Sequence, residues 1–76
     1  MNYGYHSHIQ HPLKDEIYKR QMSIDRFANM CNLHKDTLKA IIAGRTKNPV
    51  RSTIELIADG LQMSYKDIQE ICGWNR

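Results

Sequence analysis

Cysteine is scarce in this chain of 76 residues, which contains only Cys31 and Cys72. Small secreted domains usually build a disulfide framework from about four or more cysteines. Both residues have apolar neighbours within predicted helices, so we expect buried thiols and no disulfide.

Long hydrophobic runs are missing as well. The longest apolar run extends from Ala40 to Ala43, far short of the ~20 residues that a membrane-spanning helix needs. The N-terminal residues also lack the basic and apolar regions of a signal peptide. We therefore expect a cytoplasmic protein with no membrane partner.

Groups that could bind a metal or catalyse a reaction are few. Three histidines lie close together near the N-terminus: His6, His8 and His11. Cys31 and His34 have the C-x2-H spacing, but a structural zinc site needs about four ligands from ordered positions. Asp15 and Glu16 are adjacent on an exposed helix, so their side chains diverge. We expect no metal site and no cofactor, and we expect that the protein is not an enzyme.

The positive charge is concentrated in one segment. The whole chain has a net charge of +3, with 11 cations and 8 anions. Residues 34–51 hold one anion, Asp36, and five cations, namely Lys35, Lys39, Arg45, Lys47 and Arg51. This segment alone therefore carries +4. Such a surface attracts and steers polyanions, although a solvated face without a partner is the alternative.

The hydrophobic periodicity predicts an all-α fold of five helices joined by short turns. The first helix should begin at His11-Pro12, with Leu13, Ile17 and Met22 inward and five charged residues outside: Lys14, Asp15, Glu16, Lys19 and Arg20. The other helices are expected at 23–31, 35–43, 50–61 and from Ser64 onward. Residues 1–10 show little periodicity, and we expect a flexible arm there.

Several residues are typical of helix ends. Ser23 and Ser64 are expected N-caps, because a hydroxyl oxygen can accept a hydrogen bond from a free N–H of the first turn. Asp25 lies where the helix dipole favours an anion. Gly44 is expected to end the third helix. Asn32 suits the turn before that helix because asparagine tolerates a positive φ.

A set of residues at characteristic spacings resembles the phage repressor and Cro-type helix-turn-helix family. The matching residues are Ser23, Phe27-Ala28, Asn32-Leu33, Thr37-Leu38, Ile41, Gly44, Asn48-Pro49, Ile54, Ala58 and Leu61. The resemblance covers roughly Leu13 to Ser64. It implies a compact five-helix, lambda-repressor-like DNA-binding domain at 11–76, in which segments 23–31 and 35–43 form the helix-turn-helix.

The resemblance also implies a DNA contact set. The N-terminal end of the third helix would enter the major groove, and its base-contacting residues would be Lys35, Asp36, Thr37 and Lys39. Lysine can donate to guanine, aspartate can accept from cytosine, and threonine offers a hydroxyl and a methyl group. Residues expected at the DNA backbone are Ser23, Arg26, His34, Arg45, Thr46, Lys47, Asn48 and Arg51. In such loops, backbone amides and cations together hold the sugar-phosphate chain.

This chain departs from the family pattern at three places. Ile24 stands where the family commonly has a glutamine that touches the DNA backbone. Asn32 replaces the turn glycine. Ile17 and Ile42 occupy the positions of an ion pair found in many members, and two apolar residues can replace such a pair by direct packing.

Apolar residues near the C-terminus raise the question of self-association. The candidate homodimer residues are Leu56, Ile68, Ile71 and Trp74. The alternative is that Trp74 closes the bottom of the core. In the N-terminal arm no lysine or arginine precedes Lys14, which argues against minor-groove binding, so Tyr3, Tyr5 and the histidines are candidates for contact with a protein partner.

The sequence therefore favours a sequence-specific regulator that binds double-stranded DNA, of prokaryotic or phage origin, acting as a homodimer on a two-fold operator. The alternative is a protein-interaction module with a helix-turn-helix fold, such as an antirepressor or an antitoxin-like factor that binds another regulator.

Overall fold

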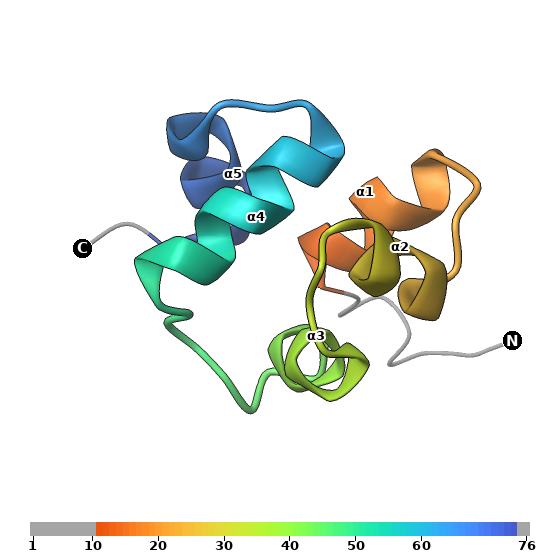
Figure 1. Ribbon diagram of the computed structural model, residues 1–76. Helices are drawn as coiled ribbons and strands as arrows, with labels where there is room; N and C mark the ends of the chain where they lie inside the picture. Colours follow the sequence, from red (N-terminus) through yellow and green to blue (C-terminus); the bar gives the residue numbers. More distant parts are fainter. Residues whose placement is uncertain (1–10, 75–76) are drawn as a thin grey trace, which may run out of the picture.

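The computed structural model describes residues 11–74, and within them it contains five α-helices and no strand (Figure 1). The helices are α1 (Pro12–Lys19), α2 (Ile24–Met30), α3 (Lys35–Ile42), α4 (Arg51–Leu61) and α5 (Tyr65–Cys72). α1 packs against α2 and α5, α2 packs against α3, and α4 packs against α5. The all-α prediction is confirmed, with bounds within two residues of the expected ones except at the end of the first helix. That helix was expected to include Met22 but ends at Lys19, and Met22 packs against the core from the turn. The predicted arm at 1–10 lies outside the described residues.

The serine N-caps form as predicted. Ser23 Oγ accepts a hydrogen bond from the backbone N–H of Arg26 at 3.1 Å. Ser64 Oγ accepts one from the N–H of Asp67 at 3.0 Å. Each bond pairs an N–H group of the first turn that has no partner within the helix.

Two further helices are capped by histidine, which the sequence analysis did not predict. His11 Nδ1 accepts a hydrogen bond from the N–H of Leu13 at 3.0 Å and caps α1. His34 Nδ1 accepts from the N–H of Asp36 at 3.2 Å and caps α3. Because only an unprotonated nitrogen can accept, both caps require a neutral imidazole.

Four residues with positive φ shape the turns after α1, α2, α3 and α4. Asn32 has φ 62° and Gly44 has φ 85°, as expected for these two residue types. Gln21 and Gln62 also adopt positive φ, at 61° and 58°. Glutamine does not favour this conformation, so these two turns could not be predicted from the residue types.

The core draws on all five helices. Its fully or almost fully buried apolar members are Leu13, Ile17, Phe27, Ala28, Cys31, Leu38, Ile41, Ile54, Ile57, Ala58, Leu61, Ile68 and Trp74. Ile17 is fully buried and Ile42 packs against this cluster. Both isoleucines therefore take part in apolar packing.

Ile68 and Trp74 do not belong to an exposed surface, which corrects part of the predicted dimer interface. Their exposed fractions are 0% and 3%. The Trp74 ring lies 6.1 Å from the His11 ring, so it closes the core where the two ends of the described chain meet. Leu56 and Ile71 stay exposed, at 37% and 36%.

α4 passes close to α2 at Gly60. A Cβ atom at this position would overlap Cys31 Sγ and lie 3.2 Å from the Phe27 ring. Burial raises the pKa of the Cys31 thiol to about 11 and that of the Cys72 thiol to about 12. Both cysteines are free, and thiols with such pKa values stay protonated at neutral pH.

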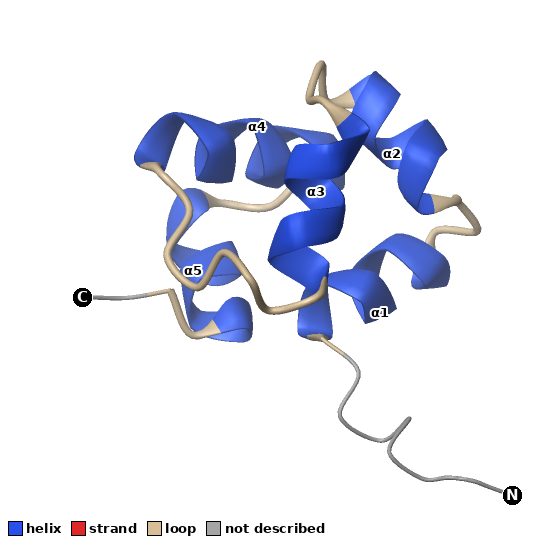
Figure 2. Cartoon of the chain, turned by 90° about the horizontal axis from the view of Figure 1, so that it is seen from below, coloured by secondary structure: helices blue, strands red, loops and turns tan. Residues whose placement is uncertain are grey.

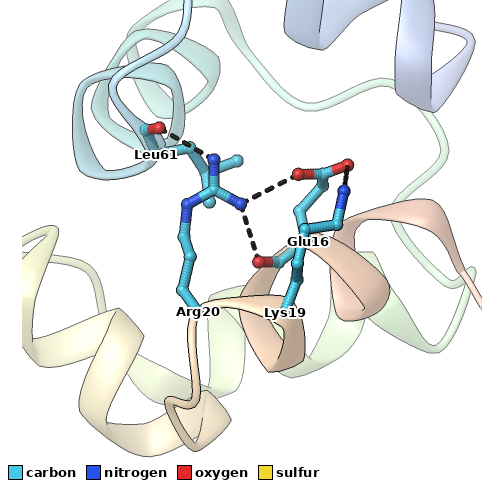
Figure 3. Close-up of polar contacts among 4 residues, drawn as sticks. All are labelled: Glu16, Lys19, Arg20 and Leu61. Carbon is cyan, nitrogen blue, oxygen red and sulfur yellow. Dashed lines mark hydrogen bonds and ion pairs between the residues drawn. The ribbon is translucent and has the colours of Figure 1, made fainter.

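Glu16 and Arg20 are less exposed than expected, because they connect α1 to α4 (Figure 3). Arg20 donates to the Glu16 carboxylate and to the Glu16 carbonyl, each at 2.8 Å, and to the Leu61 carbonyl at 3.1 Å. Lys19 reaches the same carboxylate at 3.3 Å. The Leu61 carbonyl belongs to the last turn of α4, where carbonyls lack helical partners and a cation is favourable.

Candidate nucleic-acid interface

α2 and α3 are joined by a tight turn, and α3 lies on one face of the molecule. Figure 1 looks almost along the axis of α3, at the lower edge of the domain, and Figure 2 shows from below that α3 crosses the front with the α3–α4 loop beside it. Leu38 and Ile41 are fully buried and attach α3 to the core. The opposite side of α3 is therefore open to a partner.

The four residues predicted to contact bases share this open side. Lys35, Asp36, Thr37 and Lys39 are all exposed. Three of them lie in the first turn of α3, where a helix that enters the major groove end-first presents its side chains. The predicted base-contacting residues thus lie exposed on one helix, three in its first turn and Lys39 in its last turn.

His34 stands immediately before this end of α3, with 70% of its side chain exposed. Since Nδ1 accepts the Asp36 N–H, the proton of the neutral ring is on Nε2. That Nε2–H can donate to a phosphate, as the sequence analysis expected. Nδ1 also lies 3.7 Å from the Asp36 carboxylate, which would attract the ring if it became protonated.

Lys39 does not extend freely from α3. Its Nζ lies 3.4 Å from Asp25 Oδ1 on α2, in an ion pair whose side chains are 46% and 61% exposed. The sequence predicts Asp25 in the first turn of its helix but carries no sign of its contact with Lys39. The two helices approach through tertiary packing, which periodicity does not reveal.

The loop after α3 is folded back on the helix. The N–H groups of Arg45 and Thr46 both donate to the Ala40 carbonyl, at 3.0 and 3.2 Å, and that of Gly44 donates to Ile41 at 3.1 Å. These three amides are thus engaged within the protein, contrary to the expectation that the amides of this loop hold DNA. The side chains of Arg45, Lys47 and Asn48 are exposed and Thr46 is half-buried, so these side chains are the available contact groups.

Arg51 has partners inside the domain. It donates to Glu55 at 3.2 Å, and its guanidinium lies 5.0 Å from the centre of the Tyr65 ring. With 77% of its side chain exposed, Arg51 can still reach a phosphate, but only from a position set by α4 and α5.

A hollow of about 610 Å³ lies between α2 and α3. Its lining consists of Asp25, Arg26, Ala28, Asn29, Leu33, His34 and Lys35. Arg26 was expected at the DNA backbone, and it lies on the same hollow as His34 and Lys35. Asn29, an exposed amide, is an additional polar group that sequence reasoning missed, because nothing in the family pattern marks it. Ser23 uses its oxygen as the α2 cap, which leaves its hydroxyl proton free to donate.

A second hollow, of about 400 Å³, lies between α2 and α4. Met30, Cys31, Asn32, Leu56, Asp59, Gly60 and Gln62 line it. Met30 is 52% exposed and Leu56 is 37% exposed. Leu56 was predicted as a surface residue, whereas Met30, which lies between the buried residues Ala28 and Cys31, was missed.

Across residues 11–74, no three histidine, cysteine or carboxylate side chains come together as metal ligands. No helix of this part of the chain is long and apolar enough to cross a membrane. No family model, curated protein or solved structure matches the chain.

Proposed function

We propose that this protein is a transcription regulator of the repressor or Cro type that binds double-stranded DNA sequence-specifically in a bacterial or phage-infected cytoplasm. In this proposal α3 enters the major groove and the α3–α4 loop lies on the sugar-phosphate backbone. The observation that carries the proposal is the exposure of Lys35, Asp36 and Thr37 in the first turn of α3 and of Lys39 in its last turn, while Leu38 and Ile41 of the same helix are buried.

The chemistry of the surrounding groups supports this assignment. Arg26, His34, Arg45 and Lys47 are exposed donors on α2, the cap of α3 and the following loop. Phosphate contacts of this kind set register and affinity, while the residues of the first turn of α3 set the sequence choice. Ile24, which cannot hydrogen-bond, is half-buried against the core, so the phosphate contact of α2 falls to Ser23 and Arg26.

The proposal includes a homodimer on a two-fold operator, because two recognition helices about 34 Å apart can occupy successive major grooves. With Ile68 and Trp74 in the core, the exposed apolar residues of α4 and α5 are Leu56 and Ile71. Sedimentation equilibrium on and off DNA measures this association, and a single protomer per operator would contradict it.

A selection experiment tests the function. A duplex pool with a randomised centre should yield a preferred sequence with two similar half-sites about 10 base pairs apart. Lys35→Ala should then relax discrimination at one position of each half-site by about 1–3 kcal/mol. Equal weakening on selected and random duplexes would remove Lys35 from the base contacts.

The second candidate function is a protein-interaction module that binds another regulator. It is favoured by the hollow between α2 and α4, where Met30 and Leu56 expose apolar surface beside the Asp59 carboxylate. Failure to select any duplex from the pool, together with binding to a protein partner that Leu56→Ser abolishes, would support this candidate over the first.

A further inference from the structure

The ion pair between Asp25 and Lys39 differs from the other ion pairs of the described residues. The others join residues that are at most four positions apart, as in Glu16–Arg20. Asp25 and Lys39 lie on different helices, α2 and α3. Their contact therefore fixes the direction of the Lys39 side chain relative to the partner helix of the proposed helix-turn-helix.

The location of this pair makes it relevant to DNA. Asp25 borders the hollow that Arg26, His34 and Lys35 also line. A carboxylate in the first turn of α2 is favoured by the helix dipole, but it repels phosphates that approach these three donors. The pair is exposed, and exposed pairs are weak enough to be exchanged for another partner.

We propose that Asp25 is a positioning residue for Lys39 and limits the affinity of this face for DNA of random sequence. This inference rests on the proposed function. Asp25 holds the Lys39 ammonium 3.4 Å from its own carboxylate, so Lys39 does not contact DNA until a closely fitted duplex draws it away from Asp25.

Asp25 limits the affinity for random DNA because binding to such DNA depends almost entirely on phosphate contacts. Every duplex is opposed by the Asp25 charge, and every duplex must compete with Asp25 for Lys39. On random DNA the phosphate contacts supply essentially all of the affinity, whereas an operator adds base contacts. Removing the Asp25 carboxylate should therefore raise the affinity for random DNA, because it frees Lys39 and removes the repulsion between the carboxylate and the phosphates.

The test is a double-mutant cycle on a random duplex, using Asp25→Asn, Lys39→Gln and the double variant. Glu70→Gln is the matched control, because it removes one exposed carboxylate from α5 and changes the net charge equally. Asp25→Asn should bind about two- to five-fold more tightly at low salt and should increase the salt slope by about 1. With Lys39→Gln already present, the gain from Asp25→Asn should shrink and the slope should not change.

Three results would overturn the inference, and they are distinguishable. An equal gain from Glu70→Gln would mean that only net charge matters. An undiminished gain in the Lys39→Gln background would mean that Asp25 repels DNA without positioning Lys39. If the unmodified protein does not bind random DNA even at low salt, the proposed function is wrong, and the inference that rests on it is wrong as well. Circular dichroism of each variant confirms that the helices are retained.

Discussion

At the scale of single residues, Arg20 shows how one side chain can join two distant parts of the chain. Its guanidinium contacts Glu16 in its own helix and the Leu61 carbonyl at the end of α4. Glu16 is 15% exposed and Arg20 is 30% exposed in their side chains. The pair is thus partly removed from water, where a charge-assisted hydrogen bond contributes more than at a fully exposed site.

Glu16 should make the stability of the domain sensitive to acid. The hydrogen bond from Arg20 lowers the pKa of Glu16 below its ordinary value of 4.5. Burial opposes this effect by a smaller amount, and Lys19 lowers the pKa further. A carboxylate with a lowered pKa stabilises the folded state above the unfolded pKa, and this stabilisation is lost as the pH falls through the folded pKa. The free energy of unfolding should therefore decrease as the pH drops below about 4.5.

The check is urea unfolding of the native chain and of Glu16→Gln at neutral and acidic pH. Glu16→Gln should lose about 1–2 kcal/mol at pH 7, since it replaces a charge-assisted bond by a neutral one, and its stability should fall less on acidification. Glu70→Gln, at an exposed position of α5, is the control. If both variants respond to pH in the same way as the native chain, the Glu16–Arg20 pair does not cause the acid sensitivity.

At the scale of the helices, the two histidine caps distinguish this domain from one built on serine caps alone. His11 accepts the Leu13 N–H and packs near Trp74. Burial lowers the pKa of His11 below its ordinary value of 6.5. Protonation would remove the acceptor and add a positive charge at the N-terminus of α1, where the helix dipole disfavours it.

The His11 cap should therefore weaken in mild acid. A base whose pKa is lowered on folding binds fewer protons in the folded than in the unfolded state, so stability is lost as the pH falls below the unfolded value of 6.5. His11→Asn retains an N-cap acceptor that does not titrate. Thermal unfolding between pH 8 and 5 should show a smaller loss for His11→Asn than for the native chain, and an identical loss would exclude His11 as the titrating cap.

Gly60 lies within α4, where this helix passes close to Cys31 and Phe27. Alanine is favoured over glycine in a helix interior by about 1 kcal/mol, yet a Cβ here would overlap Cys31 Sγ. We expect Gly60→Ala to destabilise the domain by about 1–3 kcal/mol, because overpacking of a tight contact outweighs the gain in propensity. Chemical denaturation measures this change.

Cys31→Ala in the same chain provides the control, because it removes the sulfur that the new methyl group would meet. The double variant should recover part of the stability that Gly60→Ala loses, relative to Cys31→Ala alone. A stabilising effect of Gly60→Ala would mean that α4 can shift away from α2 at little cost.

The helices could be predicted from the sequence because their determinants are local. Apolar spacing, the hydroxyls of Ser23 and Ser64, and the conformational freedom of Gly44 all act within a few positions. The contacts of Arg20 with Leu61 and of Asp25 with Lys39 join residues that only the fold brings together. The sequence also left open whether Trp74 is exposed or closes the core. α5 ends at Cys72, and the turn at Gly73 places Trp74 in the core.

At the scale of the whole molecule, α3, the loop after it and the start of α4 carry a cationic surface of five exposed residues. Lys35, Lys39, Arg45, Lys47 and Arg51 are all exposed, and they follow α3, its loop and the start of α4 (Figure 2). The positions of these residues along the chain predicted the composition of this face. The ion pairs of Lys39 and Arg51, and the internal bonding of the loop amides, required the three-dimensional arrangement.

The measurement that tests the central claim most directly is the fluorescence anisotropy of a labelled random duplex, titrated at about 50 and 200 mM salt. The account predicts binding that weakens steeply with salt, and a slope that falls by about 1 in Lys47→Ala but stays unchanged in Lys66→Ala, a control cation exposed on α5. No binding at the lower salt concentration, or equal slope changes in the two variants, would contradict the claim that α3 and its loop form a DNA-binding face.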